Sequence, residues 1–331
     1  MSQFTFEAGA ALIFLFLYLL LFIFLLFKYI NRSIQLKSRW TVLFLHILIR
    51  LASQGCGIGF GMTGFANTGL FLAFLVLGAE GYFSLVLCTF RFLIAWHEEN
   101  LPSHTSWLEP LRNDPTKPKP TSSQRTIQAY AFLFLGPFAL FWYPDNAMAA
   151  IHSLLLYANL LIVLGGAFLS KADFRHLDAA DTVRRLNLSK IMRTTGQGVF
   201  LACNAVLLGF VVVTALRDRR RRGVVHPTLV VLFVVWFPLI VRGAFGVLQS
   251  ADLRFSYYNP DNYDAHGFTR SYTLMEYLLG VTTEWLACFL LCCTYHTSKV
   301  DSQDSIHDLK RFNEADERED QERGGVRRNA V

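Results

Sequence analysis

The chain carries eight predominantly apolar runs, most of them about as long as the 20 residues that a helix needs to cross a bilayer. The apolar residues follow one another without the alternation that strands of a membrane barrel show, and a helix satisfies its backbone hydrogen bonds internally. The runs occupy residues 8–27, 40–60, 69–95, 127–143, 147–169, 196–216, 224–248 and 271–295. The predicted fold is all-α, a polytopic transmembrane bundle over residues 1–295 with seven or eight membrane helices.

The composition supports this class and argues against several functions. Hydrophobic residues make up 53% of the 331 residues, and 30 residues are phenylalanine, more than soluble domains usually carry. The formal charge of +6 lies between the apolar runs, so we expect contacts with the bilayer and its anionic lipids and none with nucleic acid. HExxH, GxSxG and P-loop patterns are absent from the sequence, which predicts a protein without catalytic, cofactor or metal sites.

The basic residues predict how the chain threads the membrane. The first run is followed by Lys28, Arg32, Lys37 and Arg39, which places the N-terminus outside. An eight-crossing chain would then carry its later arginine run and its charged tail, residues 296–331, outside as well. If residues 127–169 contribute a single full span, both reach the cytosol, and we favour this seven-crossing arrangement. The arginine run is either a topology signal or an anionic-lipid site: Arg217, Arg219, Arg220, Arg221 and Arg222. The tail is predicted to be disordered.

The segment from Lys171 to Arg193 alternates charged and apolar residues at roughly helical spacing. This pattern predicts a basic amphipathic helix on the membrane surface, with a plain solvated loop as the alternative. It also contains the sequon Asn187-Leu188-Ser189, so endoglycosidase sensitivity would support a position outside.

Three polar residues interrupt the second run on one helical face. His46, Arg50 and Gln54 are spaced i, i+4, i+8. A charge at the bilayer centre costs about 2.5 to 3.5 kcal/mol, so this stripe should face protein or water. Arg50 lies ten residues before Phe60 and Glu80 lies eleven after Gly69, at the same depth. We predict an ion pair between Arg50 and Glu80.

A second polar group lies near the other end of the chain. Arg242 is six residues before Leu248, and Glu276 is five after Ser271, which predicts that these two charges also lie level. Glu284 is then left without a partner; it is either a neutral structural group or a carrier of protons. The charged residues as a group either fix helix packing or line a pathway for a ligand.

Four glycines near the end of the second run form two overlapping GxxxG spacings, Gly55 with Gly59 and Gly57 with Gly61. Such spacings let helices approach closely, and packing is the role that we predict.

The stretch Val241 to Gln249, VRGAFGVLQ, together with Glu276, resembles the sixth-to-seventh helix region of the fungal RTA-like lipid-translocating exporter family. Arg242, Phe245 and Glu276 match that pattern, whereas Gly246 stands where the family has a second arginine and Gln249 where it has a glutamate. The phenylalanine-rich helices are similar to those of fungal integral membrane proteins with about seven helices. The resemblance implies lipid export or stress resistance.

These observations lead to three hypotheses. The first is a lipid-related transporter or exporter whose polar residues line an intramembrane cavity for a small apolar or lipid-like ligand. The second is a seven-helix receptor or sensor that signals through the arginine run and the tail, and the third is a non-catalytic membrane scaffold. Oligomeric state and the identity of the membrane are not indicated by the sequence.

Overall fold

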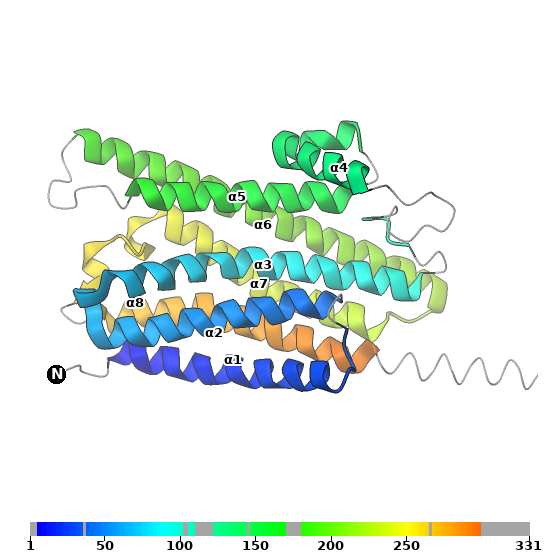
Figure 1. Ribbon diagram of the computed structural model, residues 1–331, viewed down its shortest axis with the longest axis horizontal. Coiled ribbons are helices and arrows are strands. Elements are labelled where there is room, and N and C mark those ends of the chain that lie inside the picture. Colours follow the sequence, from blue (N-terminus) through cyan, green and yellow to red (C-terminus); the bar gives the residue numbers. More distant parts are fainter. Residues whose placement is uncertain are drawn as a thin grey trace, which may run out of the picture.

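The protein is a bundle of long helices that run side by side along one axis (Figure 1). The computed structural model describes residues 5–35, 38–101, 105–109, 122–143, 146–169, 180–264 and 267–298. Within these residues, seven helices are long and apolar enough to cross a membrane. They are α1 (Phe6–Ile30), α2 (Arg39–Thr63), α3 (Thr68–Asn100), α5 (Ala147–Leu169), α6 (Ala180–Arg222), α7 (Pro227–Ala251) and a last span, Arg270–Ser298. The all-α class is confirmed, and the chain is an integral multi-pass membrane protein.

Shorter elements connect these spans. The last span begins as α8 (Arg270–Met275), passes through a π-helical turn, η5 (Glu276–Val281), and continues as α-helix over residues 282–298. Three 3-10 turns, η1 (Gly64–Asn67), η3 (Leu253–Phe255) and η4 (Pro260–Asn262), lie in the loops. The loop before α8 also holds an antiparallel strand pair, β1 (Tyr263–Asp264) and β2 (Gly267–Phe268), in which Tyr263 pairs with Phe268 and Asp264 with Gly267.

The run at residues 127–143 does not form a full span. It folds as α4 (Ser122–Leu135) followed by the 3-10 helix η2 (Gly136–Phe141). Gly136 has φ +57°, a left-handed conformation that ends α4, and Pro137 opens the next turn. The Tyr157 hydroxyl of α5 donates to the Leu133 carbonyl and ties this pair to the bundle. The pair formed by residues 127–169 therefore supplies one full span, as the seven-crossing arrangement requires.

An odd number of crossings brings the ends of the described chain to opposite sides. The basic residues Lys28, Arg32 and Arg39 lie at the same end of the bundle as the arginine run that closes α6. By the positive-inside rule we expect this end to be cytosolic, and we call the opposite end, which carries the loop at 252–269, the outer end. Residues 299–331 of the predicted tail, and with them the prediction of disorder, lie outside the described residues.

The prediction of a surface helix over residues 171–193 is wrong from residue 180 onward. Residues 180–193 are the first turns of α6, a helix of 43 residues that is about 65 Å long. Ser189 and Arg193 are buried in the bundle, and a Cβ added at Gly165 of α5 would lie 2.6 Å from Arg193 Cγ. Residues 180–193 are helical, as the pattern predicts, but the inward face of this helix packs against α5 and not against lipid. Residues 171–179 lie outside the described residues.

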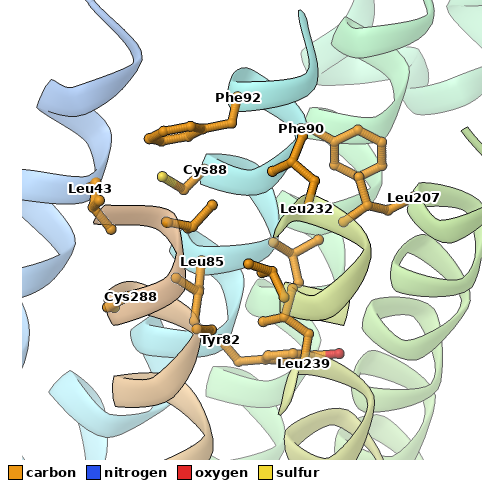
Figure 2. Close-up of a cluster of buried hydrophobic side chains, with 14 of the residues drawn as sticks. Leu43, Tyr82, Leu85, Cys88, Phe90, Phe92, Leu207, Leu232, Leu239 and Cys288 are labelled. Carbon is orange, nitrogen blue, oxygen red and sulfur yellow. The ribbon is translucent and has the colours of Figure 1, made fainter. Parts of the chain in front are cut away.

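The core is centred on α3, which contributes side chains to both sides of the bundle (Figure 2). Buried residues of five helices meet there: Leu43, Tyr82, Leu85, Cys88, Phe90, Phe92, Leu207, Leu232, Leu239 and Cys288. All six cysteines are free, and four of them are buried. They pack as small apolar side chains.

The glycines of α2 pack against neighbouring helices, as predicted for three of the four. Gly61 lies against α1, where its carbonyl accepts from the Thr5 hydroxyl at 2.7 Å. A Cβ at Gly57 would meet Phe74 of α3 and Ala11 of α1, and one at Gly59 would meet Leu70 of α3. A Cβ at Gly55 would meet no atom within 4 Å, so the packing prediction fails at that position.

Cysteine labelling tests the seven-crossing topology. Arg254, on the outer end, has a side chain 82% exposed, and Val224, beyond the arginine run, is 73% exposed. In sealed right-side-out vesicles, a membrane-impermeant maleimide should label Arg254→Cys above the wild-type background and leave Val224→Cys unlabelled. Inside-out vesicles should give the reverse. An eight-crossing chain with the N-terminus outside predicts the opposite pattern in both preparations.

Candidate functional site

Three buried charged residues from three helices meet at mid-depth in the bundle. Arg50 of α2, Arg242 of α7 and Glu284 of the last span are 3%, 6% and 0% exposed. We call them the charged triad. Arg242 Nε donates to Glu284 Oε1 at 2.5 Å, and Arg50 forms an ion pair with the other oxygen, Oε2. Glu284, which the sequence left without a partner, is therefore shared by two arginines.

The predicted pair of Arg50 and Glu80 does not form. Glu80 is half-buried and accepts a hydrogen bond from Asn159 Nδ2 of α5 at 2.7 Å. Depth counting placed the two residues at one height correctly but could not determine the direction in which each side chain points. The side of α3 that faces Arg50 is Gly81, where an added Cβ would lie 2.2 Å from Arg50 Nη2.

The predicted level pairing of Arg242 with Glu276 is also wrong as a contact. Glu276 Oε2 accepts from Gln249 Nε2 at 2.9 Å, and the same amide nitrogen donates to the Tyr272 hydroxyl at 3.1 Å. The π-helical turn η5 separates Glu276 from Glu284. A π-turn contains one residue more than an α-turn, which rotates the residues after it by about 100°. Both carboxylates face α7, but Glu276 lies level with Gln249, whereas Glu284, two turns further along the last span, lies level with Arg242 and faces the two arginines.

The other two members of the polar stripe lie in the interior, as predicted, and have partners there. His46 Nδ1 lies 2.8 Å from Ser84 Oγ of α3, and Gln54 Oε1 accepts from the Tyr277 hydroxyl at 3.4 Å. Both side chains are fully buried. The stripe on α2 therefore faces protein along its whole length.

A cavity of about 320 Å³ lies beside the triad, in the outer half of the bundle, and we call it the lateral pocket. One wall is apolar and comes mainly from α3 and α5: Leu72, Leu75, Val76, Ile162, Val163 and Ala167, with Gly78 and Gly166 between them. The other wall is polar and comes from α6, α7 and the following loop: Arg193, Gln197, Arg242, Gln249, Ser250, Tyr257 and Tyr258. Arg242 belongs to both the triad and the pocket.

The apolar wall reaches the surface of the bundle that faces lipid. Leu72, Val76 and Val163 line the pocket and are 59%, 48% and 45% exposed. Because they lie on membrane-spanning helices, the surface that they expose is covered by lipid tails. The apolar side of the pocket therefore lies at the surface that α3 and α5 present to lipid, in the half of the bundle toward the outer end.

Arg193 is the charged residue of the pocket that the sequence-based prediction missed, along with the uncharged Gln197, Ser250, Tyr257 and Tyr258. It is 8% exposed, its Nη1 donates to Ser256 Oγ at 3.5 Å, and its guanidinium lies 5.2 Å from the centre of the Tyr258 ring. Burial raises the pKa of Tyr258, so this phenol stays a neutral hydroxyl. A signal for Arg193 was present: no proline breaks residues 180–222, so a single helix was the simpler reading.

The arginine run does not act as a single unit. Arg222 pairs with Asp218 at 3.1 Å and donates to the Asn100 carbonyl, also at 3.1 Å, and Arg217 lies over the ring of Trp107. Asp218 is buried and accepts from the backbone N–H of His226, which joins α6 to α7. The remaining three arginines are exposed at the cytosolic end: Arg219, Arg220 and Arg221.

Comparison with known proteins adds no family to this description. No family model, curated protein or solved structure matches the chain.

The two positions that depart from the RTA-like pattern have clear structural roles. A Cβ at Gly246 would lie 2.5 Å from Gln197 Oε1 and 3.3 Å from Arg242 Nη1, so a larger side chain there would displace pocket residues. Gln249 donates to Glu276, and a glutamate in its place would set two carboxylates against each other. Both departures suit the contacts of this chain.

Removing the shared carboxylate should destabilise the bundle strongly. Glu284→Gln leaves Arg50 and Arg242 facing each other without an anion, and loss of one partner of a buried pair costs about 3 to 5 kcal/mol. Thermal unfolding of the purified protein in detergent should show a large fall in midpoint. Glu80→Gln is the control and should change it little, because Glu80 is half-buried and bonded to a neutral amide. Equal midpoints for the two variants would contradict the central role of the triad.

Two glycines of α3 give a matched test of the space around Arg50. Gly81→Ala should lower stability by about 1 to 3 kcal/mol, because its Cβ collides with the guanidinium. Gly78→Ala, one turn earlier, meets no atom within 4 Å and should raise stability slightly, since alanine favours helix by about 1 kcal/mol. The same detergent unfolding measurement compares them. A stabilising Gly81→Ala would show that Arg50 does not lie against α3.

Proposed function

We propose that the protein is a lipid-related transporter that takes a membrane amphiphile into the lateral pocket. The observation that carries this proposal is the division of the pocket into an apolar wall open to lipid and a polar wall with two arginines. A lipid-like molecule has the same two parts. It would enter from the outer leaflet between α3 and α5 and lay its polar end against α6 and α7.

The size and surroundings of the pocket fit part of such a molecule. A volume of about 320 Å³ is at the lower end for small-molecule sites, which suits a headgroup and the first part of a chain. The rest of the chain would stay among the lipid tails beside Leu72 and Val163. No route through solvent is needed for this end of the ligand.

A second cavity adjoins the polar end. It holds about 170 Å³ and shares Arg193 and Ser250 with the lateral pocket. Its other lining residues include Ser189, Lys190 and Ser256, toward the outer end of α6. Together the two cavities flank Arg193, with a lipid-facing space on one side and a smaller space toward the outer end on the other, an arrangement that suits a headgroup passing between leaflet and outer surface.

The pocket is also connected to the packing of the bundle. Arg242 lines the pocket and bonds Glu284, which in turn pairs with Arg50. A ligand that contacts Arg242 therefore acts on the junction of α2, α7 and the last span, as transport requires. The resemblance of Arg242, Phe245 and Glu276 to the lipid-translocating exporters favours the same function.

Lipid translocation by the reconstituted protein tests this proposal. Liposomes that contain the full-length chain should flip a fluorescent lipid analogue faster than empty liposomes, measured by bleaching of the outer leaflet. Gly78→Trp should slow this flipping at least tenfold, because its side chain fills the pocket from a backbone position with no atom within 4 Å of the added Cβ. Gly209→Trp, on the exposed surface of α6 and equally free of contacts at Cβ, should flip like wild type.

Each other result excludes the transporter or its site. Equal flipping by empty and protein-containing liposomes, with the analogue still bound by the purified protein, would favour the receptor hypothesis. Absence of both flipping and binding would favour a scaffold. Equal inhibition by the two tryptophan variants would show that the lateral pocket is not the site.

A further inference from the structure

Within the part of the chain that the structure describes, Arg193 is a buried cation without a counter-charge. Its contacts are the Ser256 hydroxyl and the face of the Tyr258 ring, and none of the carboxylates that the structure describes forms an ion pair with it. A buried charge that lacks an opposite charge is costly, by several kcal/mol for an ion of this size. The fold places this charge at the edge of two cavities and not in a packed core.

The charges around the pocket are out of balance in one direction. Arg193 and Arg242 line it, and the described lining contains no aspartate or glutamate. Glu284 pairs with Arg242 of this wall, but it is shared with Arg50. Glu276 accepts from the Gln249 amide, and among the described residues it forms no ion pair with Arg193. Arg242 Nη1 is buried and has no hydrogen-bond partner among the described residues.

We propose that the lateral pocket selects an anionic amphiphile, whose carboxylate or phosphate group binds Arg193 and compensates the excess positive charge. This inference rests on the proposed function, since it names the chemical class of the molecule that the pocket takes. Arg193 is the primary anion-binding residue, and Arg242 adds a second cation from the opposite side of the polar wall.

The surroundings of Arg193 provide further donors for such a group. Ser256 carries a hydroxyl, and the Tyr258 hydroxyl lies beside Gly166, where a Cβ would be 3.3 Å from it. Lys190 lines the adjoining cavity and adds positive charge on the outer side. A guanidinium with neighbouring hydroxyls is a suitable partner for an oxyanion, because each N–H or O–H donates to one of its oxygens.

Other headgroups fit less well for electrostatic reasons. A cationic head would place a third positive charge beside two buried arginines, and like charges at short distance in a low dielectric repel strongly. A neutral head would leave Arg193 without an opposite charge. The apolar wall with Leu72 and Val76 separates an amphiphile from a free anion, because a small hydrophilic ion gains nothing from that surface.

Direct binding to the purified full-length protein tests the inference. The probes are radiolabelled oleate and lysophosphatidate, with oleyl alcohol as the neutral single-chain probe and inorganic phosphate as the free anion. Wild type should bind both anionic amphiphiles at least tenfold more tightly than oleyl alcohol, and phosphate only weakly. Arg193→Gln should weaken the anionic probes about tenfold or more and leave oleyl alcohol unchanged, since loss of one buried charge partner costs affinity on this scale.

Two further variants control for folding and for charge. Arg184→Gln removes an exposed arginine from the same helix and should bind all probes like wild type. Arg193→Lys keeps the positive charge and should recover part of the affinity for oleate. If Arg193→Gln does not fold, the comparison of oleate with oleyl alcohol in wild type still tests whether the pocket selects an anion.

The outcomes separate this inference from the function on which it rests. Oleyl alcohol bound as tightly as oleate, or full oleate affinity in Arg193→Gln, would overturn anion selection and leave a lipid site in place. Phosphate bound as tightly as lysophosphatidate would assign the site to a free anion. If none of the four probes binds, both proposals are overturned.

Discussion

The structure depends on one carboxylate that two buried arginines share. Arg50 and Arg242 are each too costly to leave in a membrane interior without an anion, and Glu284 serves both. This requirement brings α2, α7 and the last span together at mid-depth. It also explains the glycine on α3 at position 81, because the guanidinium of Arg50 occupies the volume that a side chain would take. Packing and electrostatics therefore select the same arrangement.

The sharing leaves the described lining of the lateral pocket with two arginines and no carboxylate, an excess of positive charge at its polar wall. The fold places that excess where a cavity meets lipid. Arg242 belongs to the triad through Nε and to the pocket wall through its position on α7, while Arg193 lies across the polar wall on α6. A site for an anion that also has an apolar part follows from this placement. The same residues thus connect the stability of the bundle with the ligand that we propose.

The π-helical turn η5 joins these two roles. It begins at Glu276, which accepts from Gln249, and it sets the direction of Glu284, which follows the turn and faces the arginines. Turns of this kind are often found at functional sites. A ligand at Arg242 would act on the residue that this turn positions.

The sequence by itself determined the class of the protein, the spans and the interior position of the polar stripe, because apolar length and helical spacing are local properties of the chain. It also determined the common depth of Arg50 and Glu80, but not that of Arg242, which lies level with Glu284 and not with Glu276. Which charges pair was decided by the tertiary structure, since the direction of each side chain around its helix axis depends on the neighbours and on η5. The burial of Arg193 could not be predicted for the same reason. It arises because the first turns of α6 pack beside Gly165 of α5.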